Sequence, residues 1–420
     1  MTQRSRLVAI PDNWRILPLK YAVQLSKSRA DQRPDDLPYL GLEHIESWTG
    51  RILKDRNNTD LNLEDGISTV NLFEPEDVLF GKLRPYLAKA CYPNYSGACT
   101  TEALVLQPKK ELMSPRYLLF SLLLPEFINE VNTETFGSKM PRADWDTIGN
   151  LPIAIPPVDN QRSIVDFLNR ETVRLDNLLA SKQNLLNLLA EKRRTLIISA
   201  VTRGINPNEK LKNTGFSWLG EIPEHWEIER SKWLFKERDI RSEFGNEEML
   251  TVSHLTGVTT RAEKNVNMFL AESQEGSKIC EAGDLVINTL WAWMGAMGVS
   301  PQRGIVSPAY NVYEPGERLD KVYLDYLVRM PVFAQEAIRF SKGVWSSRLR
   351  LYPEGLYEIW FPVPPIGEQR AIAEFLDVET KKIDALQEAT DRTIALLRER
   401  RTALIAAAVT GRIDIPEATV

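Results

Sequence analysis

An internal duplication dominates this sequence. Residues 156–205 align with residues 364–413 at a constant offset of 208 positions, without a gap, and 21 of the 50 positions are identical. Solenoid repeats have periods of only ~20–50 residues, so this offset indicates a duplicated unit of a domain plus a helix. A chain built in two copies suits a target, or a set of partners, that also comes in twos.

Weaker repeats continue upstream of each matched segment. Ile10–Trp14 resembles Ile222–Trp226, and each opens a long stretch that lacks helical periodicity. In both stretches an acidic turn leads into apolar residues, which is typical of a turn followed by a strand. These turns lie at 74–79 and 281–286, further strands are expected at 97–108 and 304–315, apolar helices at 117–125 and 323–331, and closing strands at 148–155 and 356–363. Each half is therefore predicted to be an α+β unit followed by one long helix.

Each matched segment is predicted to form that long helix. The proline pairs at 156–157 and 364–365 cannot continue a helix, so they precede its first turn. Gly204 and Gly411 stand where helices commonly end in a left-handed residue. A helix of ~43 residues is ~65 Å long at ~1.5 Å per residue. A helix that long with a narrow apolar stripe needs a partner.

The apolar residues of both helices recur at spacings of four and three, which is the heptad pattern of a coiled coil. The simplest partner for each helix is the other copy, packed antiparallel. The alternative is that each helix packs on its own domain. The predicted seam consists of Ile164, Leu168, Leu175, Leu178, Leu185 and Leu189 in the first helix and of Ile372, Leu376, Ile383, Leu386 and Leu397 in the second.

These patterns predict an α+β fold with a pseudo-two-fold internal repeat. Two globular domains are joined by two long helices that pack as an antiparallel coiled coil. The expected boundaries are 1–157 for the first domain, 158–205 for the central helical region, 206–365 for the second domain, 366–414 for the C-terminal helical region and 415–420 for a tail. A chain of 420 residues is long enough for two cores.

The net charge, the lengths of the apolar runs and the cysteines indicate the environment in which the chain works. Its net charge of −5 argues against a wholly basic nucleic-acid coat but not against a local basic groove. No signal-peptide core opens the sequence, and no apolar run of about 18 residues could span a bilayer. The three cysteines form no CxxC pattern, so we expect a reducing cytoplasm and three small buried thiols.

Several catalytic motifs are missing. The sequence contains no GxxxxGK[ST] phosphate loop, no GxSxG, no HExxH and no Asn-Pro-Pro-aromatic motif. The three histidines, His44, His225 and His254, lack metal-ligand spacing. Four catalytic classes therefore lose support together, and we expect no bound metal on this chain.

Two segments in each half combine basic, aromatic and small polar residues. Arg and Lys can bind phosphates or guanine edges, and small polar residues complete the readout of bases. The candidate DNA-binding residues are Lys82, Arg84, Tyr86, Ser138, Lys139 and Arg142 in the first half and Lys342, Ser346, Arg348 and Arg350 in the second. Solvated loops are the alternative. One of the two segments of the second half is Trp291–Gly295. For Trp291 and Trp293 the core is the favoured alternative, because adjacent large apolar residues usually pack inside.

The sequence also resembles a known family at specific motifs. One is Pro-Pro-x-x-x-Gln-x-x-Ile-x-x-Phe-Leu before each long helix, at 156–168 and 364–376. The other is the joint after the first helix, with the sequence Trp-Leu-Gly-Glu-Ile-Pro-Glu-His-Trp at 218–226. Both are similar to the specificity subunits of Type I restriction-modification systems, over essentially the whole chain. One departure is the joint at the start of the chain, which is shortened to Ile10–Trp14.

The resemblance implies two target-recognition domains that each read half of a split DNA sequence, held apart by an antiparallel coiled coil. It also implies that this chain has no catalytic residue and binds no cofactor, which agrees with the missing motifs. It also implies two modification subunits, which use S-adenosylmethionine to methylate adenine, and two restriction subunits with ATP-driven translocation and cleavage, for which we expect Mg on the partners. We expect Gln161, Arg162, Gln369 and Arg370, which recur in both helices, to contact partner subunits.

Two other functions are compatible with the sequence. A single-chain DNA methyltransferase with a recognition domain would bind S-adenosylmethionine by itself. A coiled-coil adaptor that joins partners without DNA would show no sequence preference in a binding selection.

Overall fold

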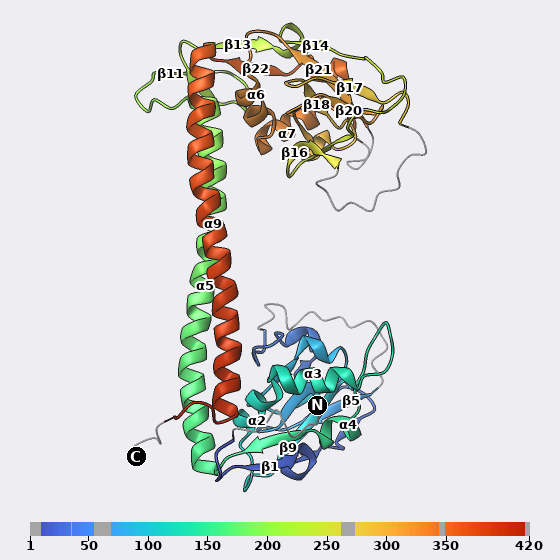
Figure 1. The fold of residues 1–420 in the computed structure, drawn as a ribbon, viewed down its shortest axis with the longest axis vertical. Helices are drawn as coiled ribbons and strands as arrows, with labels where there is room; N and C mark the ends of the chain where they lie inside the picture. Colours follow the sequence, from blue (N-terminus) through green and yellow to red (C-terminus); the bar gives the residue numbers. More distant parts are fainter. Residues whose placement is uncertain (1–9, 35, 54–68, 262–273, 344–348, 416–420) are drawn as a thin grey trace. The chain divides into compact units, whose positions relative to one another are not determined.

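The computed structural model describes residues 10–34, 36–53, 69–261, 274–343 and 349–415. The chain divides into two compact units (Figure 1): unit 1 contains Met1–Gln183 and Arg392–Val420, and unit 2 contains Asn184–Asp391. Each unit therefore combines one α+β domain with a part of each of the two long helices. These helices are α5 (Val158–Arg203) and α9 (Ile366–Val409).

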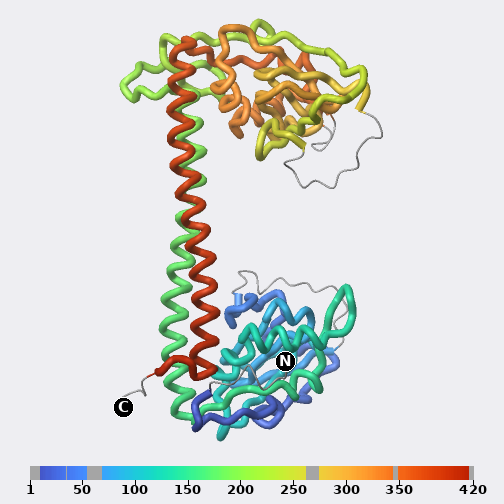
Figure 2. The backbone as a smooth tube through the Cα atoms, viewed as in Figure 1, coloured from blue at the N-terminus to red at the C-terminus, as the bar shows by residue number. Residues whose placement is uncertain are grey.

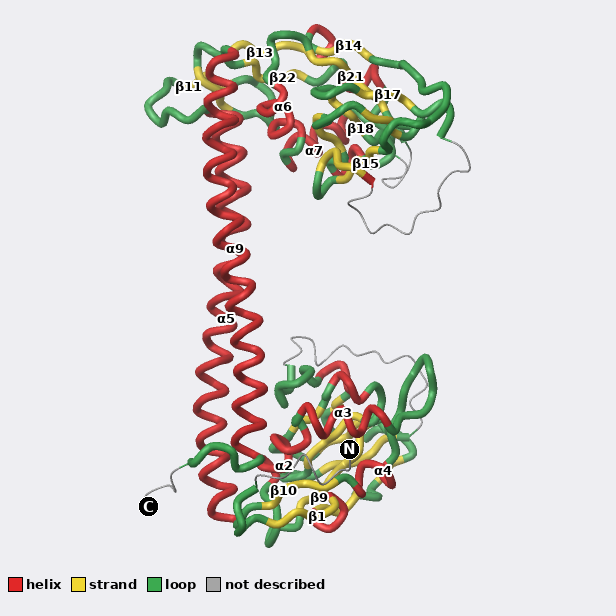
Figure 3. Tube along the Cα trace, in the orientation of Figure 1, coloured by secondary structure: helices red, strands yellow, loops and turns green. Residues whose placement is uncertain are grey.

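The domain of unit 1 contains two four-stranded sheets and one strand pair (Figure 3). The first sheet has the order β2-β9-β6-β7 and is antiparallel. The second has the order β3-β5-β8-β4, with β4 and β8 parallel, while β1 pairs with β10. The strands are β1 (Arg15–Pro18), β2 (Val23–Leu25), β3 (Arg29–Ala30), β4 (Tyr39–Leu40), β5 (Val70–Phe73), β6 (Val78–Gly81), β7 (Ala90–Cys91), β8 (Gly97–Cys99), β9 (Ala103–Pro108) and β10 (Pro152–Ile155).

Helices cover the first sheet of unit 1. They are α1 (Leu19–Ala22), α2 (Pro115–Leu122), α3 (Pro125–Thr133) and α4 (Trp145–Asn150), with short 3₁₀ turns at Leu42–His44 and Pro85–Leu87. Ser114 caps α2, since its hydroxyl accepts a hydrogen bond from Tyr117 N at 3.3 Å. The helix predicted at 117–125 corresponds to α2, which ends at Leu122. A further helix, α3, was not predicted and begins at Pro125, because proline suits the first turn of a helix.

Unit 2 repeats this architecture. Its main sheet has the order β14-β21-β18-β19, which matches β2-β9-β6-β7, and β13 pairs with β22 as β1 pairs with β10. The elements are β11 (Leu211–Asn213), β12 (Glu221–Pro223), β13 (Glu227–Arg230), β14 (Phe235–Glu237), β15 (Leu250–Ser253), β16 (Gly257–Thr260), β17 (Lys278–Cys280), β18 (Leu285–Ile287), β19 (Met297–Val299), β20 (Gly304–Val306), β21 (Asn311–Pro315), β22 (Trp360–Val363), α6 (Lys321–Val328), α7 (Pro331–Arg339) and α8 (Pro353–Leu356), with 3₁₀ turns at Ser231–Trp233 and Ala292–Met294. The duplication predicted from weak similarity is therefore confirmed.

The predicted acidic turns are also confirmed. Asp77 accepts a hydrogen bond from Glu74 N at 2.9 Å, immediately before β6. Asp284 accepts one from Glu281 N at 2.8 Å, immediately before β18. Burial raises the pKa of both carboxyl groups. These side chains close the turns that lead into the central strands.

The two long helices pack together antiparallel within each unit (Figure 2). In unit 1, Ile164 of α5 and Ile405 of α9 belong to one core, which also contains residues of the α+β domain. In unit 2, Val201 of α5 and Ile372 of α9 share the second core. Both interpretations of the helical stripe therefore apply: each helix end packs on the other helix and on a domain.

Most of the predicted seam is confirmed. Ile164, Leu168, Leu175, Leu189, Ile372, Leu376 and Ile383 are buried, and Leu397 is partly buried. Leu178, Leu185 and Leu386 were wrongly placed there, since they are 43%, 37% and 55% exposed. The seam runs instead through polar positions such as Thr172, Thr380 and Arg401, which are buried.

The prediction that Gln161 and Gln369 contact partners is also corrected. Both side chains are fully buried. Gln161 accepts a hydrogen bond from Ser114 N at 2.8 Å and donates to Leu112 O at 2.7 Å and to Pro156 O at 3.0 Å.

Gln369 makes the equivalent bonds. It accepts from Asp320 N at 2.7 Å and donates to Arg318 O and Pro364 O, each at 2.8 Å. In each unit this glutamine fastens the first turn of a long helix to the domain before it. Their exposed neighbours Arg162 and Arg370 stay predicted partner contacts.

Gln161→Ala should lower the free energy of unfolding of unit 1 by about 2–3 kcal/mol, because a buried N–H and two carbonyl groups lose their partner. Arg162→Ala, on the exposed face of the same turn, should change it by less than about 0.5 kcal/mol. Urea unfolding of both variants measures the difference. Equal losses would show that the glutamine does not fasten the helix.

Two further expectations concern the cysteines and the membrane. Cys91, Cys99 and Cys280 are free and buried, as predicted. Burial raises the pKa of the Cys99 thiol to about 12, so it stays protonated at neutral pH. Among the helices described, none has the length and apolar character needed to cross a bilayer.

Candidate nucleic-acid interface

In unit 1 the two predicted basic segments lie side by side. One follows β6 and the other follows α3, far apart in the sequence. Leu83 and Arg142 form an isolated antiparallel bridge. Arg84 N donates to Pro141 O at 2.7 Å, and Ala143 N donates to Lys82 O at 3.0 Å. The backbone thus joins both segments into one surface, which we call interface 1: Lys82, Arg84, Tyr86, Ser138, Lys139 and Arg142.

The side chains of interface 1 differ in how firmly they are held. Arg84, Ser138 and Lys139 are exposed, and Tyr86 is 46% exposed. Arg142 is partly buried, and its Nε donates to the Glu102 carboxylate at 3.0 Å. Arg84 has a left-handed backbone with φ of 50°, which is costly for a residue with a Cβ and often accompanies a functional loop. Interface 1 therefore offers one cation oriented by an ion pair, Arg142, together with exposed cations at Arg84 and Lys139.

Unit 2 has the same junction. Lys342 and Arg350 form an antiparallel bridge with N···O distances of 3.0 and 2.9 Å, in the place of the bridge between Phe136 and Arg142. Leu351 N donates to Thr289 O, which lies in the loop after β18. Lys342 Nζ contacts Glu354 at 2.9 Å, and Arg350 is exposed.

These two cations belong to interface 2, which also includes the loop at 288–296. The other predicted residues of this half, Ser346 and Arg348, lie outside the described residues.

Interface 2 also contains aromatic residues that were expected in the core. Trp291 is 51% exposed and stacks on Trp293, with ring centroids 6.1 Å apart and an interplanar angle of 18°. Their loop turns sharply at Gly295, which has φ of 86°, and Ala292 between them is buried. Trp293 is partly buried, and its Nε1 donates to Leu290 O at 3.0 Å. The sequence signal was position, since Trp293 follows Asp284 and Tyr86 follows Asp77 by the same nine residues.

The two interfaces are suited to binding. They present guanidinium, ammonium and hydroxyl groups beside aromatic rings, which are the groups that contact phosphates and bases. Within the described parts of the chain, no group of three or more His, Cys, Asp or Glu residues could hold a metal ion. Whether the ten predicted residues contact DNA stays a prediction.

Comparisons with known proteins agree with this arrangement. The family model described as Type I restriction modification DNA specificity domain matches residues 26–189. The Type I restriction enzyme MjaVIII specificity subunit of Methanocaldococcus jannaschii is 23% identical, over 97% of this chain and 94% of its own. The EcoDI specificity subunit of Escherichia coli is 24% identical, over 49% of this chain and 47% of its own.

Solved structures share the fold. A chain from a structure titled as the basis of complex assembly and conformational transition of the type I R-M system has a TM-score of 0.73 at 18% identity, covering 96% of this chain and 100% of that one. The HsdS subunit from Thermoanaerobacter tengcongensis has a TM-score of 0.56 at 18% identity, covering 96% and 98%. The matched family model and relatives that align along nearly the whole sequence lead to one conclusion: residues 26–189 match a Type I restriction modification DNA specificity domain, and the chain is similar along nearly its whole length to Type I restriction enzyme specificity subunits.

Proposed function

We propose that this chain recognises a split DNA site, with interface 1 on one half-site and interface 2 on the other. The observation that supports this most is the repeated junction, in which the loop after β6 or β18 is fixed to the loop before α4 or α8. Both copies carry cations and an exposed aromatic ring. Side chains at base edges would read the sequence, and phosphate contacts would set the register.

We further propose that α5 and α9 set the distance between the half-sites. Two recognition modules on one support commonly read half-sites about one helical turn, ~34 Å, apart. The chain itself performs no chemistry in this proposal. Two modification subunits supply S-adenosylmethionine and methylate adenine, which must leave the base stack for the reaction. Two restriction subunits supply the steps that need ATP and Mg.

Exposed leucines at equivalent positions of the two repeats support the binding of two partner subunits. Leu178 and Leu386 occupy equivalent positions in the two repeats and are 43% and 55% exposed. Leu188 and Leu396 are a second equivalent pair, also exposed. Apolar residues exposed at matching places on both repeats suit two identical partner surfaces. Arg162 and Arg370 lie on the same two helices and would add polar contacts at the rim.

The first experiment is co-expression with a Type I modification subunit from the same organism, followed by long-read mapping of methyladenine. A split motif methylated on both sides is the expected result. A stable complex without methylation would favour a scaffold. If labelled S-adenosylmethionine bound to the purified chain alone, a single-chain methyltransferase would replace the present proposal.

Arg142→Ala should weaken binding of the half-site read by unit 1 by about 10–100-fold, since a bidentate arginine contributes ~1–3 kcal/mol of discrimination. Arg350→Ala is the matched variant and should affect the other half-site. Fluorescence anisotropy at fixed salt, with sites mutated in one half, separates the two effects. Unchanged affinity of Arg142→Ala for every site would remove this residue from the interface.

A further inference from the structure

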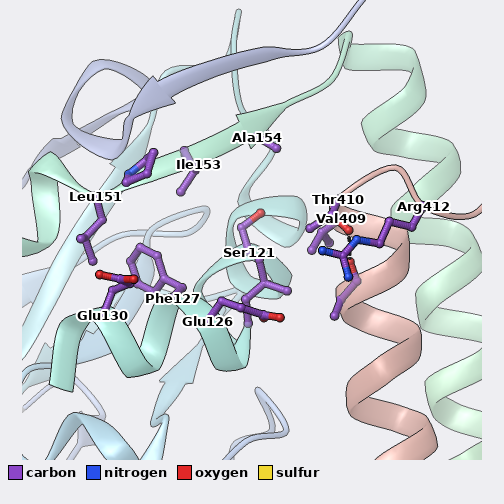
Figure 4. Close-up of a pocket in the computed structure, with 13 residues that line it drawn as sticks. Ser121, Glu126, Phe127, Glu130, Leu151, Ile153, Ala154, Val409, Thr410 and Arg412 are labelled. Carbon is purple, nitrogen blue, oxygen red and sulfur yellow. Dashed lines mark hydrogen bonds between the residues drawn. The ribbon is translucent and has the colours of Figure 1, made fainter. Parts of the chain in front are cut away.

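A cleft lies beside the core of unit 1, between α3, β10 and the last turn of α9 (Figure 4). Counting its open mouth, it has a volume of about 820 Å³. Phe127, Ile153 and Val409 give it an apolar wall, and Glu126 and Glu130 lie along one side. The cleft is therefore apolar inside, with carboxylates along one side and the guanidinium of Arg412 at the α9 end.

The equivalent place in unit 2 is covered by the chain itself. Phe127 corresponds to Phe333, because each is the third residue of a helix that begins with proline, α3 and α7. Trp218 packs edge-on against Phe333, with centroids 5.4 Å apart and an interplanar angle of 81°. Trp218 is buried in the second core. Phe333 of unit 2 thus has an indole where Phe127 of unit 1 faces a cleft.

A second aromatic contact accompanies the first. Phe216 stacks on Trp360, with centroids 5.6 Å apart and an interplanar angle of 26°. Trp360 begins β22 as Pro152 begins β10, and Pro152 lines the cleft. The segment 216–219 therefore covers in unit 2 the surface that is hollow in unit 1.

In both units, the glycine after a long helix lies against the segment through which the chain enters the domain. An added Cβ on Gly204 would meet Trp226 and Pro223, and one on Gly411 would meet Trp14 and Pro11. When Pro11 and Trp14 are matched with Pro223 and Trp226, residues 4–7, Arg-Ser-Arg-Leu, align with Phe-Ser-Trp-Leu at 216–219. The aligned segment has arginines where the covering segment has aromatic residues. Among the described residues of unit 1, none takes the place of Trp218.

We propose that the cleft of unit 1 binds an aromatic peptide segment of a partner subunit. Its indole or phenyl ring packs edge-on against Phe127, and a second apolar residue contacts Pro152. A basic residue beside the ring lies near Glu126, whose counterpart in unit 2 is Val332. The identity of the partner as a subunit of the complex rests on the proposed function; the chemistry of the cleft does not.

The test uses a fluorescent peptide with the sequence of residues 214–223, TGFSWLGEIP, and the full-length chain. Saturable binding by anisotropy is expected, weakened at least about tenfold when alanine replaces the peptide's tryptophan. Ala406→Trp, which fills the cleft, should weaken binding to the same extent. Ala395→Trp adds the same ring on an exposed part of α9 and should leave binding unchanged. No saturable binding, or binding indifferent to Ala406→Trp, overturns the proposal.

Two further measurements identify the occupant. A peptide with lysine in place of its serine, the residue beside the tryptophan, should bind more tightly to the native chain, and this gain should disappear in Glu126→Gln. A chain lacking residues 2–9 should bind the peptide with unchanged affinity. If that deletion raised the affinity for the peptide about tenfold, the chain's own residues would compete for the cleft, and the partner proposal would be wrong. Because peptide binding requires neither DNA nor methylation, its failure and failure of the proposed function are separate results.

Discussion

Replacing Arg401 with alanine should destabilise unit 1 by about 3 kcal/mol. Arg401 is 7% exposed. Its Nε donates to Asp176 at 3.1 Å, and its two Nη atoms donate to Trp48 O and Thr49 O at 3.1 and 3.2 Å. Alanine would leave two carbonyl groups without this donor. Asp176 would keep its ion pair with Arg51, whose Nη1 lies 3.3 Å from Oδ2. Removing one partner of a buried ion pair usually costs ~3–5 kcal/mol, and the remaining arginine should moderate the loss.

The duplication supplies the matched control. Arg193 occupies the equivalent position in unit 2 and donates to Asp384 at the same 3.1 Å. Those side chains are 40% and 49% exposed, so water and salt screen them, and Arg193→Ala should cost less than about 1 kcal/mol. Urea unfolding followed by hydrogen exchange would report the two units separately. Similar losses in both variants would mean that burial does not decide the strength of this pair.

Removing seven residues from both long helices should shorten the recognised DNA spacer by about three base pairs. Seven residues correspond to ~10.5 Å of helix, and DNA rises ~3.4 Å per base pair. The segments 180–186 and 388–394 are suitable, because one heptad leaves the seam on the same face. They also lie between the two ion pairs, whose partners are 17 residues apart on both helices (193 − 176 and 401 − 384).

The single deletion is the informative control. Removing 180–186 alone leaves ten residues between the partners on α5 and 17 on α9, so both pairs cannot form together. That variant should lose methylation at every spacing, whereas the double deletion should methylate a shorter motif. Methyladenine mapping of both variants gives the answer. Methylation by the double variant at the original spacing would show that the helices do not set the separation.

The sequence predicted the fold because its signals were local and repeated. Proline pairs, glycine stops and the turns at Asp77 and Asp284 depend on backbone chemistry that neighbouring residues determine. The pairing of Gln161 with three backbone groups was not predictable, because those groups meet only in the folded unit. Repetition marked Gln161 and Gln369 as important without showing that they face inward.

The seam and the interface were predicted only in part. The reason is that average hydrophobicity does not show which side chains have a partner in the folded unit. Leu178 and Leu386 attracted the prediction because they are apolar, but buried Thr172 and Arg401 occupy seam positions that hydrophobicity does not reveal. Trp291 was expected inside for the same reason. Its exposure depends on a turn at Gly295 and on stacking with Trp293. A polar side chain that has hydrogen-bond partners can be buried, and an aromatic side chain that stacks on another ring can be exposed, so the average burial of the residue type does not predict either.

Unit 1 is assembled from the first and the last stretches of the chain, residues 1–183 and 392–420. On the ribosome, at ~5–20 residues per second, roughly 10–40 s separate the synthesis of these two stretches. During that interval the apolar seam of α5 in unit 1 has no α9 to cover it. Nascent chains would therefore depend on chaperones or on a second nascent copy, and a stop codon close to the end of the gene would damage the domain made first.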